Sequence, residues 1–121
     1  MSPRVQVGAY VDAIAPMKAV RMGIEMNRLL GVDDIWFGDH TRHFLPAAMW
    51  DPKTNPMARI VPDLDAWYDP TVLVAKYGRK RGFRMGVSVT DPIRRSAADL
   101  ARVWMTLHHA TGGNVVFGIG A

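Results

Sequence analysis

The strongest constraint in this sequence is an alternation of short apolar runs with longer segments of helical spacing. The apolar runs of strand length are residues 5–10, 35–38, 83–89 and 115–119. The segments of helical spacing between them are residues 17–30, 70–77 and 92–111. Because each helix lies between two strands, the order βαβαβαβ favours a parallel sheet joined by right-handed crossovers.

The limits of the first helix follow from its flanking residues. Pro16 lies near the first helical turn, and Gly31 supplies a left-handed residue at the end. Apolar residues at spacings of three and four predict the face that packs against the sheet. These residues are Ala19, Met22, Met26 and Leu29.

The other two helices are predicted from a repeated capping device. Asp69-Pro70 and Asp91-Pro92 each place a capping carboxylate before a proline in the first turn. The second helix is expected to run through residue 77 and to end near Gly78 or Gly82, and the third to end at Gly112-Gly113. The buried stripe expected in the third helix is Ile93, Ala97, Leu100, Trp104 and Leu107.

Two architectures fit this order of elements. One is a complete doubly wound domain of four strands, and the other is a (β/α)8 barrel, which runs to about 250 residues. With 121 residues, the chain corresponds to half a barrel in length and in element count. We therefore predict an α/β fold, the N-terminal half of a TIM (β/α)8 barrel, with residues 1–121 as one truncated domain. We also expect unpaired edges on its first and last strands.

Composition narrows the possible functions. Cysteine is absent, so the chain has no disulfide framework and no thiolate metal site. The first residues lack the apolar run of a signal peptide, and no segment approaches the roughly 20 apolar residues that span a bilayer, so we expect a cytoplasmic protein. The net charge is +4, and the basic cluster Arg79, Lys80, Arg81 and Arg84 is interpreted as a solvated helix end. No nucleic-acid partner is expected, since aromatic stacking positions are not interleaved with the basic residues.

Residues 41–69 form a connection that is too long for an ordinary loop in a compact domain. This segment contains four prolines and no clean period. Its apolar side chains, among them Phe44, Trp50 and Met57, argue against disorder. We predict a long βα loop that contacts substrate or cofactor, although the same residues could simply roof the barrel.

Candidate chemistry lies at the carboxyl ends of the strands, where ligands of α/β folds gather. His40 is the sole histidine at such an end. It could be a general acid, a metal ligand with Asp39 and His43, or a structural hydrogen-bonding group. The metal interpretation is the weakest because only Asp12 and Asp91 could add ligands from other strand ends, and no metal site is predicted.

Three ordered motifs carry a resemblance that covers essentially the whole chain. They are Trp36-Phe37-Gly38-Asp39-His40, then residues 86–92 followed by Arg94-Arg95, and finally residues 112–121. The sequence resembles the luciferase-like monooxygenase superfamily, whose members use flavin mononucleotide (FMN) or the deazaflavin coenzyme F-420. Its Asp-His pair resembles that of the deazaflavin-dependent branch.

The resemblance implies a role for each residue at the strand ends. His40 would lie against the reactive ring carbon of the cofactor and exchange a proton with the substrate oxygen. Asp39 would contact the ring system or fix the histidine tautomer. Ser88 and Val89 would be joined by a cis peptide behind the ring, and Thr90 and Gly120 would complete the cofactor-binding set.

The finer resemblance is to mycobacterial ketoreductases that act on a keto group of a cell-wall lipid precursor, and it lies in residues 61–70. It implies hydride transfer between coenzyme F-420 and a small-molecule or lipid keto substrate, in a family whose members are commonly homodimeric. An FMN-dependent monooxygenase and a non-catalytic pairing partner are the alternatives. Family members continue beyond this sequence into a second half-barrel, so we expect the chain to be a fragment.

Overall fold

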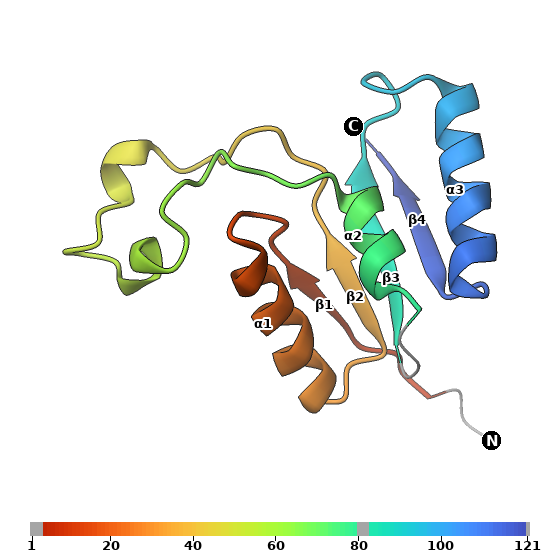
Figure 1. The fold of residues 1–121 in the computed structure, drawn as a ribbon, viewed down its shortest axis with the longest axis horizontal. Helices are drawn as coiled ribbons and strands as arrows, with labels where there is room; N and C mark the ends of the chain where they lie inside the picture. Colours follow the sequence, from red (N-terminus) through yellow and green to blue (C-terminus); the bar gives the residue numbers. More distant parts are fainter. Residues whose placement is uncertain (1–3, 80–82, 121) are drawn as a thin grey trace.

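The fold is a four-stranded parallel sheet with helices between its strands (Figure 1). It was obtained as a computed structural model that describes residues 4–79 and 83–120. The strands are β1 (Gly8–Val11), β2 (Asp34–Phe37), β3 (Arg84–Thr90) and β4 (Val115–Ile119). The helices are α1 (Met17–Leu29), α2 (Pro70–Tyr77) and α3 (Ala97–Thr111), with two short 3-10 helices, η1 (Ala47–Met49) and η2 (Pro56–Arg59). None of the described helices is long and apolar enough to cross a membrane.

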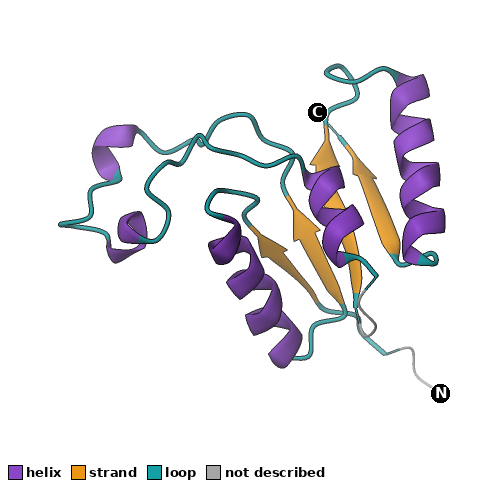
Figure 2. Ribbon diagram, in the orientation of Figure 1, coloured by secondary structure: helices purple, strands orange, loops and turns teal. Residues whose placement is uncertain are grey.

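The strands follow one another in the order β1-β2-β3-β4, and every pair is parallel. One hydrophobic cluster joins all three helices to alternate strand residues, so the helices cover one face of the sheet (Figure 2). The strand residues in that cluster are Val11, Ile35, Phe37, Met85 and Val87, and Val115 and Phe117 of β4 pack against it. A doubly wound domain places helices on both faces, whereas helices on one face are the wall of a barrel. The predicted partial TIM barrel is confirmed.

The opposite face of the sheet carries an indole ring, glycines and an ion pair. The indole of Trp36 lies across two glycines, because a Cβ atom at Gly8 or Gly86 would stand 2.5 Å or 3.1 Å from it. At the start of the strands, the Arg84 guanidinium donates to both carboxylate oxygens of the buried Asp34, at 2.6 Å and 2.9 Å. No helix among the described residues covers this face, and β1 and β4 are the edges of the described sheet.

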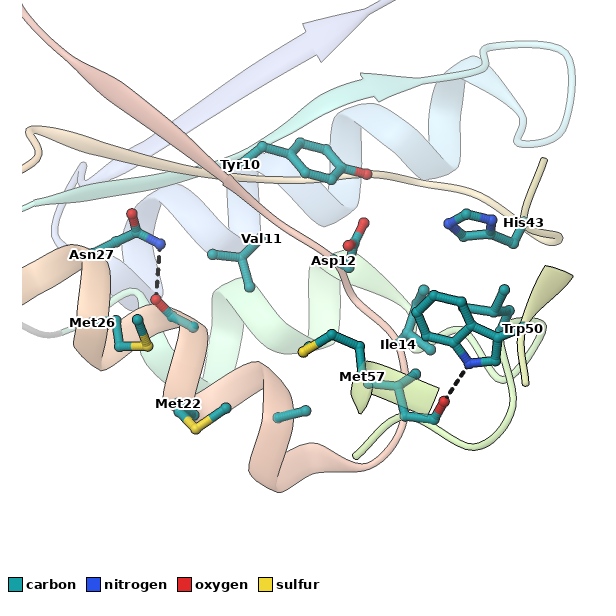
Figure 3. Close-up of a pocket in the computed structure, with 14 residues that line it drawn as sticks. Tyr10, Val11, Asp12, Ile14, Met22, Met26, Asn27, His43, Trp50 and Met57 are labelled. Atoms are coloured by element: carbon teal, nitrogen blue, oxygen red, sulfur yellow. Dashed lines mark hydrogen bonds between the residues drawn. The ribbon is translucent and has the colours of Figure 1, made fainter. Parts of the chain in front are cut away.

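The predicted buried face of α1 is wrong. Val20 and Ile24 are buried, whereas Met22, Met26 and Leu29 are 44%, 57% and 81% exposed. The helix is rotated so that Val20 and Ile24 face the sheet, and Met22 and Met26 line a hollow together with Tyr10 and Val11 of β1 (Figure 3). Periodicity alone does not distinguish two neighbouring apolar stripes on one helix.

The predicted start of α3 is also wrong. The helix begins at Ala97, because Ser96 caps it by accepting a hydrogen bond from the Asp99 N–H at 3.1 Å. The Asp91 carboxylate accepts instead from the Ile93 N–H at 2.8 Å, which forms a local turn. Ile93 is 87% exposed and Ala97 is also exposed, so neither belongs to the core, while Leu100, Trp104 and Leu107 are buried as predicted.

The ends of the other helices and strands agree more closely with those predicted from the sequence. The first strand begins at Gly8 instead of residue 5, and Gly31 and Gly112 have the left-handed conformation expected of them. The second helix ends at Tyr77, and Arg79 is exposed just after it. Gly82, with Lys80 and Arg81 of the basic cluster, lies outside the described residues.

A pair of substitutions in α1 separates the two apolar stripes. Ile24→Ala should lower the free energy of unfolding by about 2–5 kcal/mol, because it leaves a cavity in the core. Met26→Ala should change it by no more than about 0.5 kcal/mol, because that side chain is mostly exposed. Urea unfolding followed by circular dichroism measures both values. Equal losses for the two variants would mean that both stripes are buried.

Candidate active site

The Asp39 carboxylate is buried at the end of β2 and is held by groups from the end of β3. Thr90 Oγ1 donates a hydrogen bond to Asp39 Oδ2. Arg94 donates to the Asp39 backbone carbonyl, and its Nη2 lies 3.4 Å from the same carboxylate oxygen. Arg95 Nη2 lies 3.8 Å from Asp39 Oδ1. A buried carboxylate requires such partners, so this cluster fixes the chain immediately before His40.

The sheet register brings these residues together. Phe37 is paired with Val87, so the residues that follow each of them lie side by side. The Ser88–Val89 peptide is cis, as the resemblance implied, and the register with β4 shifts between Val87 and Thr90. The Gly120 N–H donates to the Thr90 carbonyl at 3.2 Å, which joins the end of β4 to the same region.

His40 is exposed and stands between two hollows. Its ring meets the Trp67 ring edge-on, with 5.0 Å between their centroids. On the β3 side is a hollow of about 460 Å³, whose lining includes Asp39, Ser88, Val89, Arg94 and Gly120. On the β1 side is a hollow of about 330 Å³, lined by Tyr10, Asp12, Arg42, His43, Phe44 and Trp67 with His40 itself.

Five of the six predicted site residues therefore line the hollow on the β3 side. Thr90 is the exception, because its side chain is buried against Asp39. Sequence reasoning assigned no role to Arg94 and Arg95, although both belong to the second motif. The sequence did contain a signal for them. Asp39 follows one apolar strand, and the adjacent Arg94 and Arg95 follow the next strand, so opposite charges come after neighbouring strands. Among the described residues, no group of three histidine or carboxylate side chains could hold a metal ion.

The long connection after β2 is ordered and returns to the sheet. The Ala15 N–H donates to the Ala66 carbonyl at 2.8 Å, and the Tyr68 N–H donates to the Ala13 carbonyl at 2.6 Å. These bonds flank an antiparallel bridge between Ile14 and Trp67. The loop is thus clamped to the segment after β1, and this contact brings Trp67 beside His40.

A third hollow, of about 300 Å³, lies between this loop and α1 (Figure 3). It is mostly apolar, with Met22 and Met26 from α1 and Trp50 and Met57 from the loop. The indole N–H of Trp50 donates to the Val61 carbonyl at 2.6 Å, which holds the loop wall in shape. Tyr10 lines both this hollow and the one beside His40, so the two are neighbours along the edge of β1.

Similarity to known proteins was found for both the sequence and the fold. No family model matches the chain. The phthiodiolone/phenolphthiodiolone dimycocerosates ketoreductase of Mycobacterium kansasii is 38% identical over 95 residues, which are 76% of this chain and 26% of that protein. The protein of the same name from Mycobacterium sp. (strain JLS) is 34% identical over 125 residues, covering 97% of this chain and 32% of its own length. The resemblance inferred from the three motifs is confirmed.

A solved structure supports the fold. The coenzyme F420 dependent tetrahydromethanopterin reductase from Methanopyrus kandleri matches with a TM-score of 0.67 and 17% identity. The match covers 98% of this chain and 27% of that chain. The four strands and three helices are therefore one part of a larger barrel architecture. The chain spans about a third or less of the length of each of these similar proteins.

Asp69 links the candidate site to α2. Its carboxylate caps the helix by accepting from the Thr71 N–H at 2.8 Å, and it accepts from Arg95 at 2.8 Å. Burial raises the pKa of Asp69, but the hydrogen bonds from Thr71 and Arg95 outweigh burial, so the pKa lies below its usual value. Arg95 therefore bridges the helix cap and the buried Asp39 carboxylate.

Asp69→Asn should reduce the pH dependence of stability. A lowered folded-state pKa stabilises the protein above the unfolded pKa of about 4 and loses that contribution as the pH falls through the folded value. The substitution keeps a capping side chain but removes the charge, so it should cost at most about 1 kcal/mol at pH 7, since the carboxylate is partly exposed. Its unfolding free energy should also fall less steeply below about pH 4.

Urea unfolding at several pH values between 2 and 7 measures this difference. Asp99→Asn is the matched control, because Asp99 also lies at a helix start but pairs with Arg102 on an exposed surface. Identical pH profiles for Asp69→Asn and the original chain would contradict the assigned role of the Asp69 charge.

Proposed function

We propose that this chain is the part of a deazaflavin-dependent ketoreductase that carries the proton donor and one wall of the cofactor site. The observation that carries the proposal is the position of His40. It separates a hollow lined by the residues that the resemblance assigns to the cofactor from a hollow lined by aromatic side chains. Homologues named as ketoreductases support the reaction class, and the fold of an F420-dependent reductase supports the cofactor.

The hollow on the β3 side is large enough for a ring system. Its volume of about 460 Å³ is within the range of small-molecule sites, which is about 300–1,000 Å³. Gly120 adds no side chain to the hollow, and a Cβ atom there would stand only 2.9 Å from the Val89 side chain. Asp39, Ser88 and Val89 would hold the ring, with Thr90 supporting Asp39 from behind. Coenzyme F-420, when bound, supplies a hydride.

The residues of this chain would handle the proton and the substrate. The exposed His40 imidazole can donate a proton to a substrate oxygen. The buried cluster around Asp39 keeps this imidazole in position. Phe44 and Trp67 would hold the apolar part of the keto substrate and exclude water from it. The expected homodimer stays a prediction.

A fluorescence titration tests the cofactor assignment. Oxidised and reduced coenzyme F-420 and FMN are added separately to the chain and to His40→Ala and Asp39→Ala. We expect saturable binding of the deazaflavin, weakened by about tenfold in each variant, which corresponds to about 1.4 kcal/mol. His108→Ala is the matched control, because His108 is an exposed histidine at the far end of α3.

Each alternative has a distinct result in this titration. Saturable binding of FMN alone would favour the monooxygenase. A folded chain that binds neither cofactor would contradict the proposal that this chain alone can hold the cofactor. That result would favour the alternative in which the chain is a non-catalytic pairing partner. Equal affinity in His40→Ala and His108→Ala would remove His40 from the site.

A further inference from the structure

Tyr10 and His40 face the same small space above Gly38. A Cβ atom at Gly38 would stand 2.0 Å from the Tyr10 hydroxyl oxygen, 2.6 Å from His40 Cδ2 and 2.9 Å from His40 Nε2. The hydroxyl oxygen and the imidazole nitrogen are therefore at most 4.9 Å apart, close enough for one ligand oxygen in the adjoining hollow to contact both, and any side chain at residue 38 would collide with both groups. Both side chains also line the hollow on the β1 side.

The Tyr10 hydroxyl is available to donate a hydrogen bond. Burial raises the pKa of Tyr10, the nearby Asp12 carboxylate raises it further, and a hydrogen bond with the Gly38 backbone lowers it by less. The group therefore stays protonated at neutral pH. A contact that favours the ionised form is one in which the hydroxyl oxygen accepts, so it does not use the hydroxyl proton. Tyr10 is 47% exposed, so a ligand can reach it.

We propose that Tyr10 and His40 form a two-donor site for a single oxygen atom of a neutral ketone, and that this pair is the substrate end of the proposed reductase. The reaction that follows ketone binding rests on the proposed function, whereas the binding itself does not. It adds Tyr10, from the end of β1, to a site that otherwise depends on the ends of β2, β3 and β4.

The chemistry of the hollow fits a neutral ketone. Phe44 and Trp67 provide apolar walls for the groups beside the carbonyl. The carboxylate of Asp12 and the guanidinium of Arg42 both line the hollow, so opposite charges balance and neither sign of substrate charge is favoured. Two hydrogen bonds to one oxygen are strongest when that oxygen acquires negative charge during reduction.

The reaction balances with one named co-reactant. A reduced deazaflavin would supply a hydride for the carbonyl carbon and become oxidised, and the carbonyl π electrons would move to the oxygen. His40 gives that oxygen its proton and recovers one from solvent, while Tyr10 keeps its own proton and stabilises the developing charge by hydrogen bonding. The product is a secondary alcohol.

Carbon-13 NMR of a labelled ketone tests the pair. The probe is 2-nonanone labelled at the carbonyl carbon, added to the chain until its signal stops moving. Each hydrogen bond to the oxygen moves the carbonyl resonance downfield, so Tyr10→Phe should lose about half of the displacement. It should also bind roughly three- to tenfold more weakly, which is the effect of one lost hydrogen bond. Tyr77→Phe in α2 removes a hydroxyl outside the hollow and should change neither quantity.

A second measurement does not depend on the folding of a variant. With tyrosine labelled at Cζ in the unaltered chain, the Tyr10 resonance should move on addition of 2-nonanone while those of Tyr68 and Tyr77 stay in place. An unmoved Tyr10 resonance at saturation would overturn the proposal. So would an undiminished carbonyl displacement in Tyr10→Phe, or no saturable binding of the ketone.

These results are separable from the cofactor titration. Deazaflavin binding that depends on His40, together with no effect of Tyr10 on the ketone, would leave the proposed function standing and remove this inference. Ketone binding through both donors in a chain that binds no deazaflavin would support the two-donor site and count against the proposed function.

Discussion

The buried negative charge of Asp39 is the constraint on which the candidate site depends. A carboxylate removed from water must be compensated, and here a threonine of β3 and two arginines beyond it do so. The same contacts lock the end of β2 to the end of β3 and, through Arg95, to the cap of α2. His40 is the next residue in the chain, so its position is a consequence of how its neighbour is neutralised.

Much of the architecture could be predicted from local chemistry. Some features depend only on residues close together in the chain. They are the apolar strand runs, the capping aspartate before Pro70 and the glycines with positive φ, and the structure has them where the sequence predicts them. The strand-end rule pointed to His40 and its neighbour Asp39, and the resemblance assigned Ser88, Val89 and Gly120 to the cofactor; all five line one hollow. The cis peptide between Ser88 and Val89 came from the resemblance and not from the residues themselves.

The errors concern choices that tertiary packing makes. Two neighbouring apolar stripes run along α1. The stripe with Val20 and Ile24 packs against the sheet, and the stripe with Met22 and Met26 does not. Asp91 and Ser96 were both competent caps, and the aspartate satisfied a turn instead. Arg94, Arg95 and Tyr10 acquired their importance from strand register and from the space that Gly38 leaves, which no spacing along the chain encodes.

The clamp between Ile14 and Trp67 separates the long loop into a base joined to the segment after β1 and an outer part that packs beside α1. The base holds the aromatic ring that meets His40, while η1 and η2 project away from the sheet (Figure 1). For such a closed loop, each doubling of length costs only about 0.6 kcal/mol in closure entropy. Natural variation can therefore lengthen or rebuild the outer part with little effect on the residues beneath it, so the loop and the strand ends can evolve independently.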